Sequence, residues 1–247
     1  MNNVLICEGS TDYSLLQYYM REACGWVDDR TKQNNIIRVQ GQKSRNLVKN
    51  QDILTIMSTG GCSRLGEGLR NVLSRNMGSA PDLSDAFTKV VIITDRDEVN
   101  TEIDFIASVE SIFSEFGVVH QEAVSHNKWN DCEMVNSTGR KLRFSLLLLI
   151  IPFEETGAME SFLLNVIAAN NDYDKNIIEQ CKNLVDNVDP EKRYLTGRRI
   201  ITKAKFDTYF SVRTPAEQFV ERQNILKSVK WEDYAKIQQD FQLLNDL

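Results

Sequence analysis

Short apolar runs alternate with amphipathic segments through the first 170 or so residues, and this alternation constrains the fold more than any other feature. The runs with the length and apolar content of buried strands are residues 4–7, 36–39, 53–57, 89–94 and 144–151. Segments with apolar residues at helical spacing follow at 12–24, 63–75, 101–116 and from 157 onward. Strands that alternate with helices pair in parallel through right-handed crossovers. The sequence therefore predicts an α/β fold with a mostly parallel sheet flanked by helices.

The pattern changes twice along the chain, and both changes suggest how it is organised. Residues 118–143 are polar and contain a turn-like stretch at 136–139, which predicts an inserted hairpin of short antiparallel strands. Beyond residue 171 the pattern is helical only, with helices expected at 174–188, 199–212, 215–226 and 232–244. We therefore expect an α/β domain over residues 1–171 and a helical C-terminal extension, residues 172–247, packed on it.

Composition narrows the class of protein. The five cysteines are scattered without a CxxC pair and only two histidines are present, which argues against a zinc site and against a disulfide framework. The longest apolar run, 146–151, is far shorter than the roughly 20 residues of a membrane span. The N-terminal residues lack the charged and apolar regions of a secretion signal. We expect a cytoplasmic protein without membrane contact.

The charge distribution limits how a polyanion could bind. The formal net charge is −6, so the molecule as a whole does not attract nucleic acid, and binding would need local basic patches. Residues 30–49 contain six basic residues and no acidic one. A second basic cluster consists of Lys192, Arg193, Arg198, Arg199, Lys203 and Lys205. Each cluster is interpreted either as a grip on a phosphate backbone or as ordinary solvated surface.

Carboxylates follow two of the predicted strands. Glu8 comes directly after the run at 4–7, and Asp95 and Asp97 come directly after the run at 89–94. The carboxyl ends of neighbouring parallel strands face one crevice, where these acids could meet. Mg²⁺ and Mn²⁺ select oxygen ligands and keep water or substrate phosphate oxygens in the remaining positions. The sequence thus predicts a divalent-cation site, the alternative being plain loop and helix-capping acids.

Two further acids are candidates for the same site. Asp12 lies four residues after Glu8, where it would either join the metal shell or favour the positive N-terminus of the following helix. Glu160 opens a later helix, where it would either supply a carboxylate for a second metal or remain an ordinary helix-end acid. Both interpretations stay open for each residue.

Glycines and lysines give weaker signals. The turn at Gly60-Gly61 is interpreted either as a backbone cradle for phosphate or as an ordinary tight turn. Lys203 and Lys205 would either neutralise charge that develops on a phosphoryl group or be solvated helix residues.

The combination of these motifs resembles the TOPRIM domain, which is shared by topoisomerases, bacterial primases, small RNA-maturing ribonucleases and the overcoming-lysogenization-defect (OLD) nucleases. The matching residues are Glu8-Gly9, Gly60-Gly61 and Asp95-Arg96-Asp97. The Glu-Gly-x-x-acid form, with Asp12 as the second acid, is more similar to the OLD-type nucleases, and the glycine that often follows the aspartate pair is absent. The resemblance implies a Rossmann-like TOPRIM fold and Mg²⁺ bound by Glu8, Asp95 and Asp97.

Later segments resemble uncharacterised TOPRIM-like bacterial proteins of about this length. These segments are residues 150–160 and 202–206. With them, the resemblance extends over most of the first 210 residues, although only about a dozen positions are specific.

We therefore interpret the chain as a Mg²⁺- or Mn²⁺-dependent nuclease that hydrolyses phosphodiester bonds in DNA or RNA. Glu8, Asp95 and Asp97 would hold one cation, and Asp12 and Glu160 would hold a second one about 4 Å away. Lys203 completes the predicted catalytic set. A role in defence against phage is implied by the OLD resemblance alone.

Two other hypotheses remain. The chain is alternatively a non-enzymatic or conditionally active partner of a separate ATPase, because OLD-like nucleases join an ATPase in one chain or as a companion, and this sequence has no Walker-type phosphate loop. A less favoured class is a phosphotransfer or primer-synthesising enzyme. The choice between DNA and RNA, the number of metals and the formation of a homo-oligomer are open at this stage.

Overall fold

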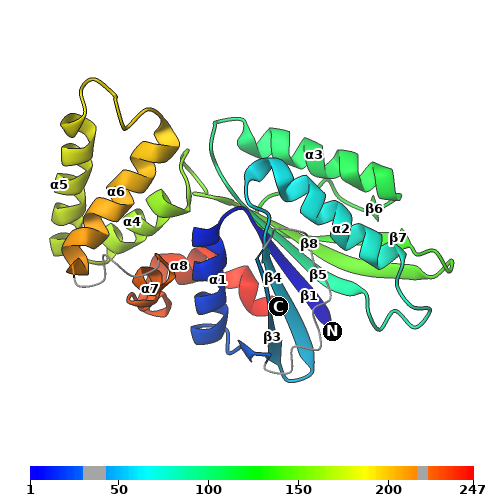
Figure 1. The fold of residues 1–247 in the computed structure, drawn as a ribbon. Coiled ribbons are helices and arrows are strands. Elements are labelled where there is room, and N and C mark those ends of the chain that lie inside the picture. The colour runs from blue at the N-terminus through cyan, green and yellow to red at the C-terminus, as the bar shows by residue number, and fades with distance from the viewer. Residues whose placement is uncertain (30–42, 216–221) are drawn as a thin grey trace.

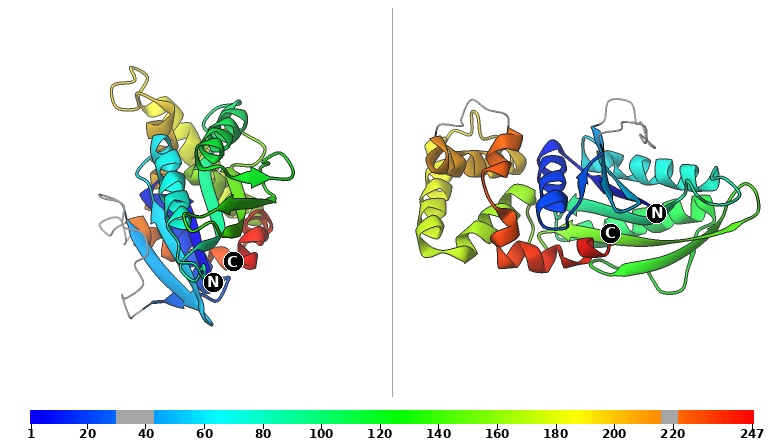
Figure 2. Two further views of the ribbon diagram at one scale, coloured as in Figure 1. Left: turned by 90° about the vertical axis from the view of Figure 1, so that its right-hand side faces the viewer. Right: turned by 90° about the horizontal axis from the view of Figure 1, so that it is seen from below.

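A twisted sheet forms the body of the molecule, and helices cover both of its faces (Figure 1). The structure is a computed structural model that describes residues 1–29, 43–215 and 222–247. Helices α2 and α3 lie on one face of the sheet and α1 lies on the other. Helices α4, α5 and α6 lie beyond the end of the sheet at which the parallel strands finish (Figure 2).

The central four strands are parallel and the outer strands are antiparallel. The sheet order is β2-β3-β4-β1-β5-β8-β7-β6. The parallel strands are β4 (Asp52–Ser58), β1 (Asn2–Cys7), β5 (Phe87–Asp95) and β8 (Lys141–Ile151). The antiparallel strands are β3 (Ser44–Lys49) and β2 (Val27–Asp28) on one side, and β7 (Trp129–Val135) and β6 (Val119–His120) on the other. The α/β class and the parallel centre of the sheet are confirmed.

Most predicted strands are present, with some differences at the edges. The expected hairpin within 118–143 is confirmed, because β7 and β8 pair antiparallel around the turn at 136–139. The strand expected at 36–39 lies outside the described residues. β3 was not expected from the sequence, since its outer half is polar and its pairing with β4 is antiparallel. The sheet is therefore a mixed one, larger than the four-stranded parallel core that the apolar runs predict.

Both faces of the central strands are buried, which explains why these strands read as continuous apolar runs. Along β5, Val90 and Ile92 pack in a core with α2 and α3. Their neighbours Val91 and Ile93 pack in the opposite core, which contains α1 and α4. This alternation follows from the two-residue period of a strand, and it fixes the register of β5 against β1 and β8.

The helices follow the predicted segments closely in the middle of the chain. Their bounds are α1 Ser10–Glu22, α2 Leu65–Met77, α3 Thr101–Phe116, α4 Met159–Asn170, α5 Asp172–Val188, α6 Arg198–Arg213, α7 Arg222–Lys227 and α8 Ala235–Asp240. A short 3-10 turn, Cys62–Arg64, precedes α2. No helix in the described ranges is both long enough and apolar enough to span a bilayer.

The C-terminal segment differs from the single helix expected at 232–244. It consists of a 3-10 turn at Trp231–Asp233, the short helix α8 and a second 3-10 turn at Gln242–Asp246. These pieces return to the sheet, where the ring of Phe241 meets that of Tyr19 on α1 with 5.2 Å between the centroids. Trp129 of β7 donates its indole N–H to Asp246, 2.9 Å away. The segment breaks because it bends along the core to make these contacts.

Candidate functional site

The register of β1 and β5 brings Glu8 beside the end of β5. Cys7 lies opposite Ile93 in the parallel pair, so the residues that follow, Glu8 and Thr94, are neighbours. The Glu8 carboxylate accepts a hydrogen bond from the Thr94 hydroxyl, and its Oε1 lies 2.9 Å from the backbone nitrogen of Asp95. The predicted meeting of Glu8 with the end of β5 is confirmed.

The Gly60-Gly61 turn holds the backbone of Glu8 in place. The N–H groups of Gly60 and Gly61 donate to the Glu8 carbonyl oxygen at 2.8 and 3.0 Å. Both glycines have a positive φ, +80° and +147°, which side-chain-bearing residues rarely adopt. Because these two N–H groups already bond to protein, the tight-turn interpretation is confirmed and the phosphate-cradle interpretation is wrong for this structure.

Asp12 both caps a helix and belongs to the carboxylate site. Its Oδ2 accepts a hydrogen bond from the Gly9 backbone nitrogen, 2.8 Å away, at the start of α1. The helix-capping role is thus present. Only 6% of the residue is exposed, although an exposed position would suffice for a cap. Its burial places a second carboxylate behind Glu8.

The N-terminus of α4 completes the site. The backbone N–H of Met159 donates to Asp95 Oδ1 at 2.9 Å, so α4 orients the carboxylate that ends β5. The next residue, Glu160, is 4% exposed. The hydroxyl of Thr11 on α1 donates to Glu160 Oε1 at 3.2 Å. Helices α1 and α4 therefore bring Asp12 and Glu160 to the same carboxyl edge.

The carboxylates raise one another's pKa, which indicates that they lie close together. Burial raises the pKa of Glu8 above its ordinary value. Burial, followed by the charges of Glu160 and Glu8, raises the pKa of Asp12 to about 7. Burial, followed by the charges of Asp12 and Glu8, raises the pKa of Asp95 to about 9. Buried like charges are costly unless a cation or a proton compensates them.

Asp97 lies at the rim of this site rather than inside it. Half of its side chain is exposed, and its Oδ1 accepts a hydrogen bond from Arg198 Nη2 at 3.0 Å. The negative charge of Asp97 also contributes to the raised pKa of Glu8. Asp97 thus borders the four buried acids and is paired with a cation from the C-terminal part of the chain.

The predicted basic residues divide between this site and other partners. Lys205 pairs with Asp186 of α5 at 2.7 Å, which directs it away from the carboxylates. Lys203 is partly buried and follows Arg199 by four residues, so the two share one face of α6. The positive charge of Arg199 lowers the pKa of Glu8 against the effect of burial. The first turns of α6 therefore lie near the carboxylate edge.

The first basic cluster is largely accounted for by other contacts or lies beyond description. Residues 30–42 fall outside the described part of the chain. Arg45 pairs with Asp28 at 2.8 Å, and Lys49 lies over the Trp26 ring at 5.9 Å. These two residues thus have structural roles along the edge of the sheet.

The four buried acids have the chemistry of a hard-cation site. Glu8, Asp12, Asp95 and Glu160 are all oxygen donors, the type that Mg²⁺ and Mn²⁺ select. Among the residues that the structure describes, no three His, Cys, Asp or Glu side chains are arranged to hold a metal ion as they stand. Glu8, Asp12 and Asp95 instead accept backbone N–H groups, so binding an ion would require small rotations of these side chains.

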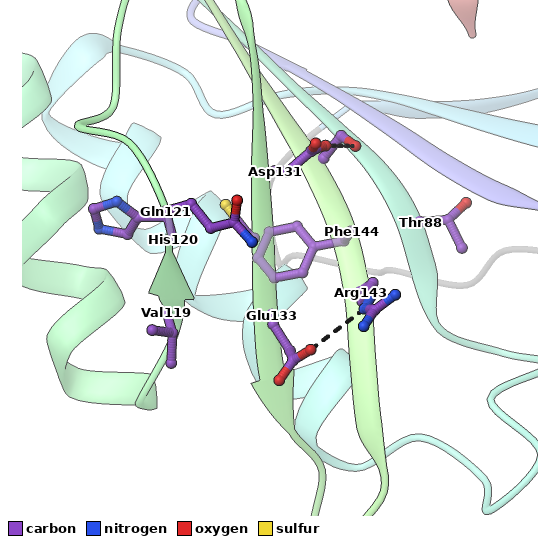
Figure 3. A pocket seen from close by; sticks show the side chains of 10 residues that line it. Thr88, Val119, His120, Gln121, Asp131, Glu133, Arg143 and Phe144 are labelled. Carbon is purple, nitrogen blue, oxygen red and sulfur yellow. Dashed lines mark hydrogen bonds and ion pairs between the residues drawn. The ribbon is translucent and has the colours of Figure 1, made fainter.

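A separate pocket lies at the opposite end of the strands. Its volume is about 530 Å³, and its lining includes Thr88 near the start of β5 and Arg143 near the start of β8. Figure 3 shows Glu133 and Arg143 on neighbouring strands, and they pair at 3.3 Å. None of the predicted site residues lines this pocket.

Sequence reasoning missed three contributors to the site. Thr94 is the residue before Asp95, and the strand register alone would have placed it beside Glu8. The Met159 backbone N–H could have been inferred from its position at the start of a helix. The pairing of Arg198 with Asp97 joins residues 101 positions apart, and no signal in the sequence identified it.

The fold and the site together define an α/β protein with acidic residues at the carboxyl edge of its parallel strands. The chain belongs to the family described as protein of unknown function (DUF3226), whose model matches residues 2–244. No curated protein matches it. A solved structure with a similar fold is a hypothetical protein from Pyrococcus horikoshii OT3, with 17% sequence identity and a TM-score of 0.53. The alignment covers 99% of this chain and 98% of that protein.

Proposed function

We propose that this protein is a Mg²⁺- or Mn²⁺-dependent nuclease that hydrolyses phosphodiester bonds in DNA or RNA. The observation that carries the proposal is the convergence of Glu8, Asp12, Asp95 and Glu160 at the carboxyl edge of the sheet. The resemblance of these positions to TOPRIM motifs supports the same chemistry. A TOPRIM-like fold, the OLD-type branch and a role in phage defence are parts of this proposal.

The acids divide into two sets by position. Glu8 and Asp95, with Asp97 at the rim, would hold one cation, and Asp12 and Glu160 would hold a second. When bound, such ions polarise the phosphate, lower the pKa of a bound water and stabilise the attacking and leaving oxygens.

The other residues of the chain orient the acids. The Thr94 hydroxyl and the Asp95 backbone N–H fix the Glu8 carboxylate, and the Met159 backbone N–H fixes that of Asp95. Lys203 lies on the same face of α6 as Arg199 and adds positive charge that would favour an anionic substrate. This arrangement requires no covalent nucleophile from the protein.

The test is cleavage of nucleic acid by the purified protein. Labelled single-stranded and double-stranded DNA and RNA are incubated with Mg²⁺, Mn²⁺ or EDTA. We expect cleavage that depends on the cation and falls at least a hundredfold in Glu8→Gln and Asp95→Asn. Asp131→Asn, an exposed acid on β7, is the matched control and should keep wild-type activity. Wild-type activity in both site variants would refute the assignment.

A second candidate function is that of a conditionally active partner of a separate ATPase. It is favoured by large apolar side chains that are exposed on α5, α6 and the loop between them, a feature typical of interaction surfaces. They are Tyr173, Leu184, Val188, Tyr194, Ile200 and Val212. Cleavage that appears only when an ATPase encoded beside the gene is added would favour this function, whereas robust cleavage by the isolated protein would favour the first.

A further inference from the structure

The first turn of α6 contacts the rim of the carboxylate site. Arg198 Nη2 lies 3.0 Å from Asp97 Oδ1 and 3.5 Å from Glu98 Oε1. These acids follow β5, whereas Arg198 belongs to the C-terminal part of the chain. The ion pair therefore joins the helical C-terminal part to the edge of the sheet at the point where a substrate would approach.

The start of α6 has the electrostatic character of an anion-binding element. Its N-cap is Gly197, no side chain caps it, and its first turn contains no acidic residue. The N-termini of α1, α3, α4 and α5 all have acids in the first turn. The positive end of the α6 dipole is thus reinforced by Arg198 and Arg199 instead of being compensated within the helix.

Arg199 shows that the element also acts inside the site. Its positive charge is felt at Glu8, where it lowers the carboxyl pKa. Two arginines from one helical turn therefore lie close to two different acids of the proposed catalytic set. Arginine has a planar fork of donors that matches a phosphate, and it stays charged at any working pH.

We propose that the first turn of α6 is the phosphate-binding element of this site, in which Arg198 is held by Asp97 until a divalent cation takes that carboxylate. The inference rests on the proposed function and deepens it. A cation at Asp97 repels the guanidinium group and replaces it as counter-charge, and the released Arg198 binds a phosphodiester oxygen of the substrate. Cation and polyanion should consequently bind with positive coupling, each raising the affinity for the other.

The experiment measures the two binding steps separately in Arg198→Gln. Mn²⁺ binding is followed by electron paramagnetic resonance of the free ion, and binding of a fluorescent phosphorothioate oligonucleotide, which resists cleavage, is followed by anisotropy. Arg193→Gln is the matched control, because Arg193 is an exposed member of the same basic cluster whereas the pairs to Asp97 and Glu98 are made by Arg198. Arg198→Lys keeps the charge without the fork.

We expect opposite effects on the two ligands. Arg198→Gln should bind Mn²⁺ about two- to fivefold more tightly, since a half-exposed ion pair that competes with the metal is removed. In the presence of Mn²⁺ it should bind the oligonucleotide about tenfold more weakly, with a salt slope smaller by about one. Arg198→Lys should lie between it and the wild type, and Arg193→Gln should match wild-type Mn²⁺ affinity.

Each contrary outcome has a distinct meaning. If the wild type binds Mn²⁺ and Arg198→Gln binds both ligands with unchanged affinity, the inference is wrong and the proposed function stands. Weaker oligonucleotide binding with unchanged Mn²⁺ affinity would overturn the exchange at Asp97. If the wild type binds no Mn²⁺ at all, the proposed function and this inference both fail. A thermal melt of each variant checks that the fold is intact.

Discussion

Replacing Asp12 by Asn should stabilise the cation-free protein, and the gain should depend on pH. Asp12 is 6% exposed, and its pKa is raised from 3.8 to about 7 by burial and by its acidic neighbours. The folded protein therefore holds a proton on this carboxyl that the unfolded chain has already released. Because the folded state binds more protons, its stability falls as the pH rises from about 4 to about 7.

The magnitude follows from the difference between the two pKa values. At about 1.4 kcal/mol per pH unit, ionising Asp12 in the folded state costs about 4 kcal/mol once the pH exceeds 7. At pH 5 the corresponding cost is only about 1.6 kcal/mol. Asn has a similar shape and keeps an oxygen that can accept the Gly9 N–H, so the helix cap should survive. The advantage of the variant should grow by roughly 2 to 3 kcal/mol between pH 5 and pH 8.

The assay is urea unfolding of both proteins in EDTA at several pH values, with Asp131→Asn as the exposed control. Added Mn²⁺ should reverse the ranking at pH 8, because a ligand that binds only the folded state stabilises it by about 2.7 kcal/mol at a hundred times its Kd. Unfolding free energies of the wild type and of Asp12→Asn that run parallel from pH 5 to pH 8 would refute the reasoning, since they would mean that the buried carboxyl titrates normally.

Three further predictions concern individual contacts. Thr94→Val removes the hydroxyl that bonds to Glu8 and should weaken Mn²⁺ binding about tenfold without unfolding the protein, as measured by resonance titration. Gly61→Ala should lower the unfolding free energy by about 1 to 3 kcal/mol because φ is +147°, whereas Gly197→Ala, in an extended conformation, should cost less than about 1 kcal/mol in urea unfolding. A maleimide should label Cys62 first, since the other cysteines are buried, and a bulky adduct there should block cleavage, with Cys62→Ser as the resistant control; labelling of that variant at the wild-type rate would contradict this.

The inner strands and the acids that follow them could be predicted from the sequence because local patterns determine both. A strand that is buried on both faces must be apolar throughout, and the parallel register then brings Glu8 and Asp95 to one edge. Asp12 and Glu160 were predictable as candidates because each opens a helix that follows such a strand.

The remaining features depend on tertiary contacts that leave no local pattern. β3 is amphipathic and lies toward an edge of the sheet, so its polar half hides it. The expected helix at 232–244 is divided because Phe241 and Asp246 bond to the sheet side of the core. The pairing of Arg198 with Asp97 depends on how α6 is placed relative to β5, which neither segment encodes alone.

The contact between Tyr19 and Phe241 gives the last residues of the chain an influence on the distant acids. Phe241 also stacks on Phe162 of α4, with 5.8 Å between the ring centroids, so one ring braces both helices that deliver Asp12 and Glu160. Removing residues 241–247 would uncover two aromatic side chains and let these helices move apart. Trimming at that end would thus be felt as a loss of cation affinity before any loss of the sheet itself.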